Sequence, residues 1–241
     1  MKKIKSLFVL LLTSVSSIVL GQQNQEVTLQ SFNKIDMQGI MKVELVKGKT
    51  NKITTEALNG ANLEDLTVAV SGGELAVKTK IFKQLTDRDN NKRKADSQKL
   101  FKVRIEYTNE LSSLQIGRGA ELVSAETLTG NRLLVDASSG AIVTLKVSVN
   151  NLELSSVQGA IVNLEGKATF QQTKVNTGGE LFAYNLISDE VEIRANTGGV
   201  AQVSANKMLD ASAGTGGTIT YKGNPSERNV KSNLGGEVRS N

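Results

Sequence analysis

The sequence predicts an all-β protein folded as a parallel β-helix with rungs of about 20 residues. The first observation is a set of seven glycine turns, whose last glycines lie 21, 19, 20, 20, 18 and 19 residues apart. The second is the alternation of valine, isoleucine and leucine between these turns, with no helical period. A fixed period of this length is typical of stacked supersecondary units. The predicted turn glycines are Gly119, Gly140, Gly159, Gly179, Gly199, Gly217 and Gly236.

Residues 1–21 have the pattern of a secretory signal peptide. Three lysines among the first five residues precede a mostly apolar stretch over residues 6–20, and cleavage is expected before Gln22. The stretch is shorter than the ~20 residues of a membrane-spanning helix, so an uncleaved anchor is the less favoured interpretation. The chain is therefore expected to be exported to the periplasm, the cell surface or the medium. No transmembrane span is expected after cleavage.

Composition removes several classes of function. Without the three signal lysines the chain has 26 basic and 24 acidic residues, so the net charge falls from +5 to +2 and nucleic-acid binding is not expected. The chain has no cysteine and no histidine. Disulfides, thiolate or imidazole catalysis and the usual zinc sites are thereby excluded. The double glycines are not followed by the Gly-x-Asp of a calcium β-roll, and we expect no metal or cofactor.

The mature chain is predicted to be a single β-helical domain over residues 22–241. Residues 22–107 form a strand-rich N-terminal section with apolar residues at period 2. A charged segment over residues 82–99 interrupts this section and is interpreted as a solvated loop. Its consecutive Lys92, Arg93 and Lys94 leave open a basic docking finger for an acidic partner. Residues 108–241 carry the glycine-turn repeats.

Stacking of the rungs predicts columns of identical character along the solenoid. In the six consecutive rungs that begin at Gly140, the residue two positions after the predicted turn glycine is apolar and is expected to point inward. These residues are Ile142, Ile161, Leu181, Ala201, Ile219 and Val238. An antiparallel sandwich would also have short strands and frequent turns, but it would not require this register over six rungs.

Three stretches carry a resemblance to a known family. They are Phe-Asn-Lys-Ile-Asp-Met-Gln-Gly at residues 32–39, the repeated glycine rungs, and the ending Ile-Thr-Tyr-Lys-Gly-Asn-Pro at residues 219–225. The chain resembles the putative auto-transporter adhesin, head GIN domain family of secreted Bacteroidetes proteins, over residues 27–238. The resemblance implies an exported, right-handed β-helix. It supplies no catalytic or binding residues.

Two classes of function remain. The leading prediction is a non-catalytic, adhesin-like binding module for a polysaccharide or a protein partner, and the alternative is a β-helix polysaccharide lyase or hydrolase. Glycoside hydrolysis needs two carboxylates roughly 5–10 Å apart, and no acidic column forms at equal positions of the rungs. The candidate ligand-binding residues are the aromatic Phe182, Tyr184 and Tyr221, which could instead fill the core. Association of two copies through an uncovered end of the solenoid is also expected.

Overall fold

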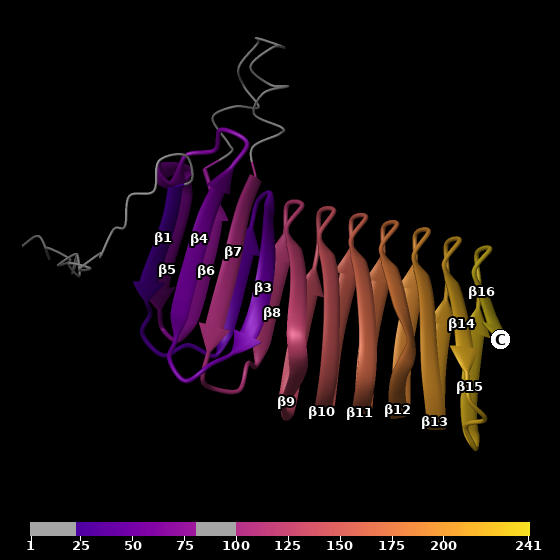
Figure 1. Cartoon of the computed structure of the whole chain (residues 1–241). Helices are drawn as coiled ribbons and strands as arrows, with labels where there is room; N and C mark the ends of the chain where they lie inside the picture. Colours follow the sequence, from indigo (N-terminus) through magenta and orange to yellow (C-terminus); the bar gives the residue numbers. More distant parts are fainter. Residues whose placement is uncertain (1–22, 81–99) are drawn as a thin grey trace, which may run out of the picture.

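A computed structural model of the chain describes residues 23–80 and 100–241 (Figure 1). The predicted signal peptide and the predicted charged loop at residues 82–99 lie outside the described residues. In chain order the elements are β1 (Gln23–Thr28), β2 (Lys34–Gln38), β3 (Met41–Lys47), β4 (Lys52–Leu58), the 3-10 helix η1 (Leu63–Asp65), β5 (Leu66–Ser71), β6 (Glu74–Thr79), β7 (Leu100–Tyr107), β8 (Ser113–Gly117), β9 (Glu121–Ala137), β10 (Ile142–Val157), β11 (Ile161–Asn176), β12 (Glu180–Asn196), β13 (Val200–Ala213), β14 (Thr218–Lys222), β15 (Glu227–Ser232) and β16 (Glu237–Ser240).

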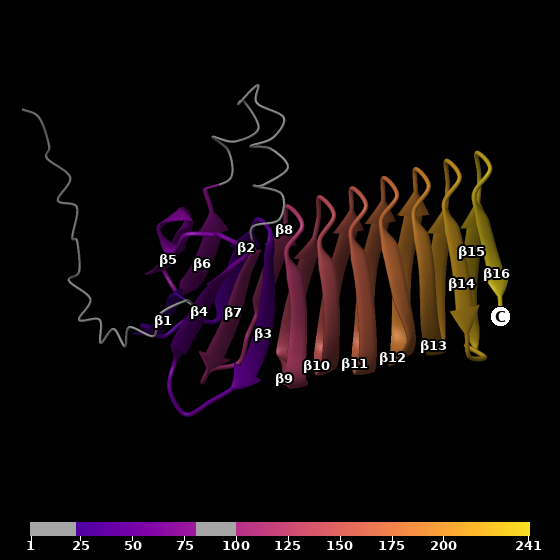
Figure 2. The ribbon, with the colours of Figure 1, turned by 45° about the horizontal axis from the view of Figure 1, so that its top comes forward.

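The second half of the chain is a β-solenoid in which each rung pairs in parallel with the next. Tight turns lie in line along one edge, and strands β9 to β13 bend at the opposite edge (Figures 1 and 2). We call the strand segments that leave a tight turn the outgoing sheet and those that lead back to one the returning sheet. The solenoid has about seven turns with rungs of about 19 residues, which confirms the predicted fold class. The parallel ladders exclude the antiparallel sandwich.

The N-terminal strands extend both sheets and change their pattern. Strand β3 pairs in parallel with β9 on one side and with β7 on the other, while β2 lies between β8 and β6 in the returning sheet. Beyond these, β4 pairs antiparallel with β7, β1 with β4, and β5 with β6. The first rung is thus covered by antiparallel strands.

The interior is filled by columns of apolar side chains that repeat from rung to rung. In the outgoing sheet the inward column is Leu122, Val143, Val162, Leu181, Ala201 and Ile219, all fully buried. The predicted column was wrong in its first two members. Ile142 pairs with Ile161, which pairs with Glu180 on the outer surface, and Ile142 is 40% exposed. The later members, from Leu181 onward, are inward as predicted.

This error has its origin in the turns, which have one shared geometry. In each, two consecutive residues have positive φ, as in Thr197 (50°) and Gly198 (71°), and the next amide donates to the carbonyl of Asn196 (3.0 Å). This is the pattern of a type I′ turn, whose second central position favours glycine. The positive-φ glycines of these seven turns are Gly119, Gly140, Gly159, Gly178, Gly198, Gly216 and Gly235.

The last four predicted turn glycines therefore have a different role. Gly179, Gly199, Gly217 and Gly236 follow the positive-φ pair, at the position that Ala120, Ala141 and Ala160 occupy in the earlier turns. A Cβ built on Gly199 would lie 2.3 Å from the carbonyl oxygen of Val175, so close backbone approach is the constraint there. Alignment on the last glycine of each turn consequently shifts the early rungs by one residue.

Candidate functional site

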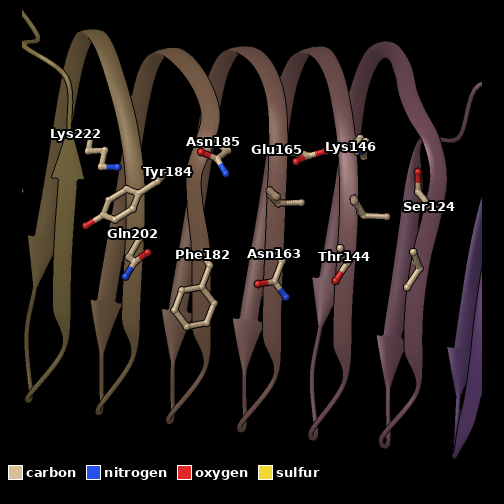
Figure 3. A pocket seen from close by; sticks show the side chains of 13 residues that line it. Ser124, Thr144, Lys146, Asn163, Glu165, Phe182, Tyr184, Asn185, Gln202 and Lys222 are labelled. Carbon is tan, nitrogen blue, oxygen red and sulfur yellow. Dashed lines mark ion pairs between the residues drawn. The ribbon is translucent and has the colours of Figure 1, made fainter.

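The candidate site is an open groove of about 540 Å³ on the outer surface of the outgoing sheet, between β9 and β14. Two rows of side chains line it (Figure 3). The first row is held in register by the parallel ladders and consists of Val123, Thr144, Asn163, Phe182 and Gln202. The second row, nearer the bends, includes Ser124, Lys146, Glu165, Tyr184, Asn185 and Lys222.

The groove lies where the register of the ladders shifts. Between β9 and β10, the three residues 124–126 oppose the single residue Leu145. Between β12 and β13, the four residues 183–186 oppose Val203. Such bulges bend a strand and redirect side chains. Leu145 and Leu164 are almost fully buried at the floor of the groove, and Ser124, Tyr184 and Asn185 of the bulges also line it.

Phe182 and Tyr184 share the groove, as the alternation of β12 predicts. The Phe182 side chain is 36% exposed, and the Tyr184 ring is half-buried. The ammonium of Lys222 on β14 lies 4.3 Å from the centroid of the Tyr184 ring, in cation–π contact. The aromatic part of the groove thus has one ring open to solvent and one ring already covered by a cation.

Tyr221 does not share this surface, and its predicted place beside the other two aromatics was wrong. It pairs with Val203 in an inward column and is 5% exposed. Its hydroxyl accepts a hydrogen bond from Nη1 of Arg228 (2.8 Å). Because side chains alternate along β14, Tyr221 faces the interior while Lys222 faces the groove.

Over residues 23–80 and 100–241, one of the two groove lysines has an acidic partner and the other has none. Nζ of Lys146 lies 2.7 Å from Oε1 of Glu165, so these two form an ion pair. Lys222 forms no ion pair with any residue that the structure describes. Of the described residues that line the groove, Glu165 is the one carboxylate, so they do not supply the pair of carboxylates that glycoside hydrolysis uses.

A second, smaller hollow of about 400 Å³ lies at the bends of β10 to β13. At its rim Nζ of Lys207 lies 2.9 Å from Oδ2 of Asp189. The hydrogen bond from Lys207 lowers the pKa of Asp189, and the same contact raises the pKa of Lys207. Over residues 23–80 and 100–241, no three acidic side chains gather closely enough to hold a metal ion.

Sequence reasoning missed the polar members of the first row. Thr144, Asn163 and Gln202 each follow their positive-φ glycine by four residues, as Phe182 follows Gly178. This constant offset predicts the first row from the sequence, but only when residues are counted from the positive-φ glycine of each turn. The predicted turn glycines themselves lie at the turn edge and outside the groove lining.

Among the residues that the structure describes, no helix has the length and apolar composition of a membrane span. A family model described as putative auto-transporter adhesin, head GIN domain, matches residues 31–225. A search among curated proteins finds no match.

Several solved structures share the fold at low sequence identity. A putative adhesin from Bacteroides fragilis NCTC 9343 is 18% identical, with a TM-score of 0.78 over 92% of this chain and 98% of that chain. A putative adhesin from Parabacteroides merdae ATCC 43184 is 18% identical, with a TM-score of 0.65 over 91% and 96% of the two chains. A putative lipid binding protein from Parabacteroides distasonis ATCC 8503 is 17% identical, with a TM-score of 0.65 over 91% and 96%.

Proposed function

Because the chain belongs to the putative auto-transporter adhesin, head GIN domain family, we propose that it is a non-catalytic, adhesin-like module of the cell surface. Its groove on the outgoing sheet holds an extended polysaccharide that runs along the solenoid axis. The signal pattern at residues 1–21 and the family both favour export.

The observation that carries this proposal is the first row of the groove. Each rung presents one outward side chain at the same position, and adjacent strands are about 4.8 Å apart. A linear 1,4-linked polysaccharide advances by a similar length with each sugar. A chain lying across the rungs therefore meets a new side chain with each sugar, without a change of register.

The chemistry of the row suits sugars. The exposed Phe182 ring can pack against the apolar face of a pyranose, and Asn163 and Gln202 on its two sides offer amide donors and acceptors to hydroxyl groups. Ligand sites commonly combine apolar surface with a few placed polar groups. The lone carboxylate, Glu165, is tied to Lys146, which favours binding over hydrolysis.

The test is a pull-down of the full chain on a panel of immobilised polysaccharides, followed by analysis of the supernatant for shortened products. We expect at least one polysaccharide to retain the chain without product release. Phe182→Ala should weaken retention about tenfold, the effect of losing one well-placed aromatic contact.

Phe170→Ala is the matched control, because this half-buried phenylalanine lies on β11 outside the groove lining. Release of shortened chains would overturn the non-catalytic assignment in favour of a β-helix lyase or hydrolase. If no polysaccharide retains the chain, the proposal of a polysaccharide ligand is overturned. A protein partner on the apolar outer surface at Val123, Ile142 and Val200 would then be the next ligand to test.

A further inference from the structure

The most specific feature of the groove is the pairing of Lys222 with Tyr184. Lys146, in the same row, is neutralised by Glu165 at 2.7 Å. Lys222 instead has an aromatic ring at 4.3 Å and no carboxylate in ion-pair contact among the described residues. A ring attracts the ammonium but leaves its full charge in place. Within the described part of the chain, the groove consequently carries a positive charge at Lys222 that no carboxylate compensates.

The backbone holds this lysine in a defined position. Lys222 is the last residue of β14, where it pairs with Ser204 of β13. It is followed by Gly223, whose φ is +102° and whose added Cβ would lie 2.0 Å from the carbonyl oxygen of Ala205. On the other side, the bulge at residues 183–186 of β12 brings Tyr184 over the intervening strand toward Lys222. Preorganisation of this kind lowers the entropy cost of binding a ligand.

We propose that Lys222 and Tyr184 form a subsite for the carboxylate of an acidic sugar, and that the ligand of the groove is a uronic-acid-containing polysaccharide. The inference rests on the proposed function and names its ligand class. Phe182 on β12 and Lys222 on β14 are two strands apart, about 9.5 Å along the axis. This distance places one sugar on Phe182, one beside Gln202 of β13, and the carboxylate of the next at Lys222.

The experiment is calorimetric titration of the full chain with an oligogalacturonide and with the same oligosaccharide after reduction of its carboxyl groups. The native chain should bind the acidic form roughly fivefold more tightly, the effect of one exposed ion pair. The preference should shrink as salt is added, because exposed charges are screened.

Lys222→Met keeps the aliphatic stem and removes the charge. We expect this variant to bind both oligosaccharides equally, with the affinity that the native chain has for the reduced form. Lys174→Met is the matched control, since Lys174 is an exposed lysine of the returning sheet. It should keep the native preference.

The outcomes separate this inference from the proposed function. If the native chain binds both oligosaccharides equally and Phe182→Ala weakens both, the acidic subsite is wrong and the polysaccharide groove stands. A preference that survives in Lys222→Met also overturns the subsite. If neither oligosaccharide binds, the acidic subsite and the polysaccharide groove are both overturned for this class of polymer. If the native chain sediments with phosphatidylglycerol vesicles and Lys222→Met does not, the ligand of the subsite is an anionic lipid headgroup and not a sugar carboxylate.

Discussion

The N-terminal section, over the described residues between 23 and 107, and the rungs that follow it build their cores in different ways. The first buries large side chains that differ from strand to strand, including Phe32, Met37, Met41 and Phe101, under mixed parallel and antiparallel pairing. The rungs bury valine, leucine and alanine in columns, and every ladder among them is parallel. Both belong to the same continuous sheet system.

The difference shows where each region derives its specificity. In the N-terminal section large buried side chains such as Phe32 and Phe101 have no equivalent one strand away, so shape complementarity fixes their arrangement. In the rungs each side chain meets its equivalent one rung away, so the period and the turns fix the arrangement. In the N-terminal section, substitutions that remove side-chain volume should therefore lower the free energy of unfolding most. In the rungs, the largest losses should come from substitutions that disturb the backbone of the turns.

The largest expected effect is in the N-terminal core. Phe32 is 1% exposed, and Phe32→Ala should lower the free energy of unfolding by about 3–5 kcal/mol, the cost of truncating a buried phenylalanine. Denaturant unfolding followed by circular dichroism measures the change. Val123→Ala, at a 48% exposed position of the rungs, should change the stability by no more than about 0.5 kcal/mol. A loss below about 1 kcal/mol for Phe32→Ala would contradict the dependence on volume.

Two neighbouring glycines test the dependence of the rungs on backbone geometry. A Cβ on Gly199 would lie 2.3 Å from a backbone oxygen, whereas one on Gly198 would meet nothing within 4 Å. Gly199→Ala should cost about 2–3 kcal/mol through overpacking. Gly198→Ala should cost about 1 kcal/mol through its positive φ alone. The unfolding midpoints of the two variants show which substitution destabilises the chain more.

The same pair sharpens the comparison between early and late turns. Ala160 occupies the position of Gly199 in an earlier turn and is fully buried there. If Gly199→Ala proved as mild as Gly198→Ala, the late turns would have to relax into the geometry of the early ones. The two sets of turns would then be interchangeable.

The smallest expected effect concerns the exposed ion pair at the bends. Asp189 has a lowered pKa in the folded chain, so its contribution is present above its ordinary value of 3.8 and is lost as the pH falls through the lowered value. Lys207 has a raised pKa, so its contribution is present below 10.5 and is lost as the pH rises through the raised value. The stability difference between the native chain and Asp189→Asn should therefore persist at neutral pH and disappear in strong acid.

Unfolding midpoints of the native chain and the variant, recorded across the acid range at low salt, measure this difference. Asp136→Asn is the control, because Asp136 forms no ion pair among the residues that the structure describes. A difference for Asp189→Asn that does not change with pH would contradict the ion pair as its cause.

The period of the glycines was sufficient to predict the solenoid, because a turn that needs positive φ leaves a visible residue at each rung. It was not sufficient to predict the exact register. Glycine serves two purposes in these turns: Gly178 adopts a positive φ, and Gly179 allows close approach of a neighbouring backbone. The amino-acid sequence does not distinguish these two roles. Ile142 was placed inward for this reason, although it is 40% exposed.

The site was predictable only in part. Alternation along β12 correctly placed Phe182 and Tyr184 on one surface, since it is a local property of a strand. Tyr221 was assigned to the same surface although the correctly predicted inward residue Ile219 lies two residues before it, so alternation along β14 already puts Tyr221 inward and Lys222 outward. The contact of Lys222 with Tyr184 also depends on a bulge at residues 183–186. No local sequence pattern predicts this bulge, because a register shift is set by the pairing of two strands.

The steps between positive-φ glycines vary from one rung to the next, yet the turns stay in line along one edge. The extra residues are taken up by bulges in the strands: residues 124–126 and 183–186 bulge beside the groove, and residues 206–207 oppose Asp189 near the bends. The turn edge therefore stays constant from rung to rung, while the number of residues in a rung changes within the strands, chiefly beside the groove. An insertion in the middle of a strand would by this geometry enlarge a bulge beside the groove and leave the turns in line.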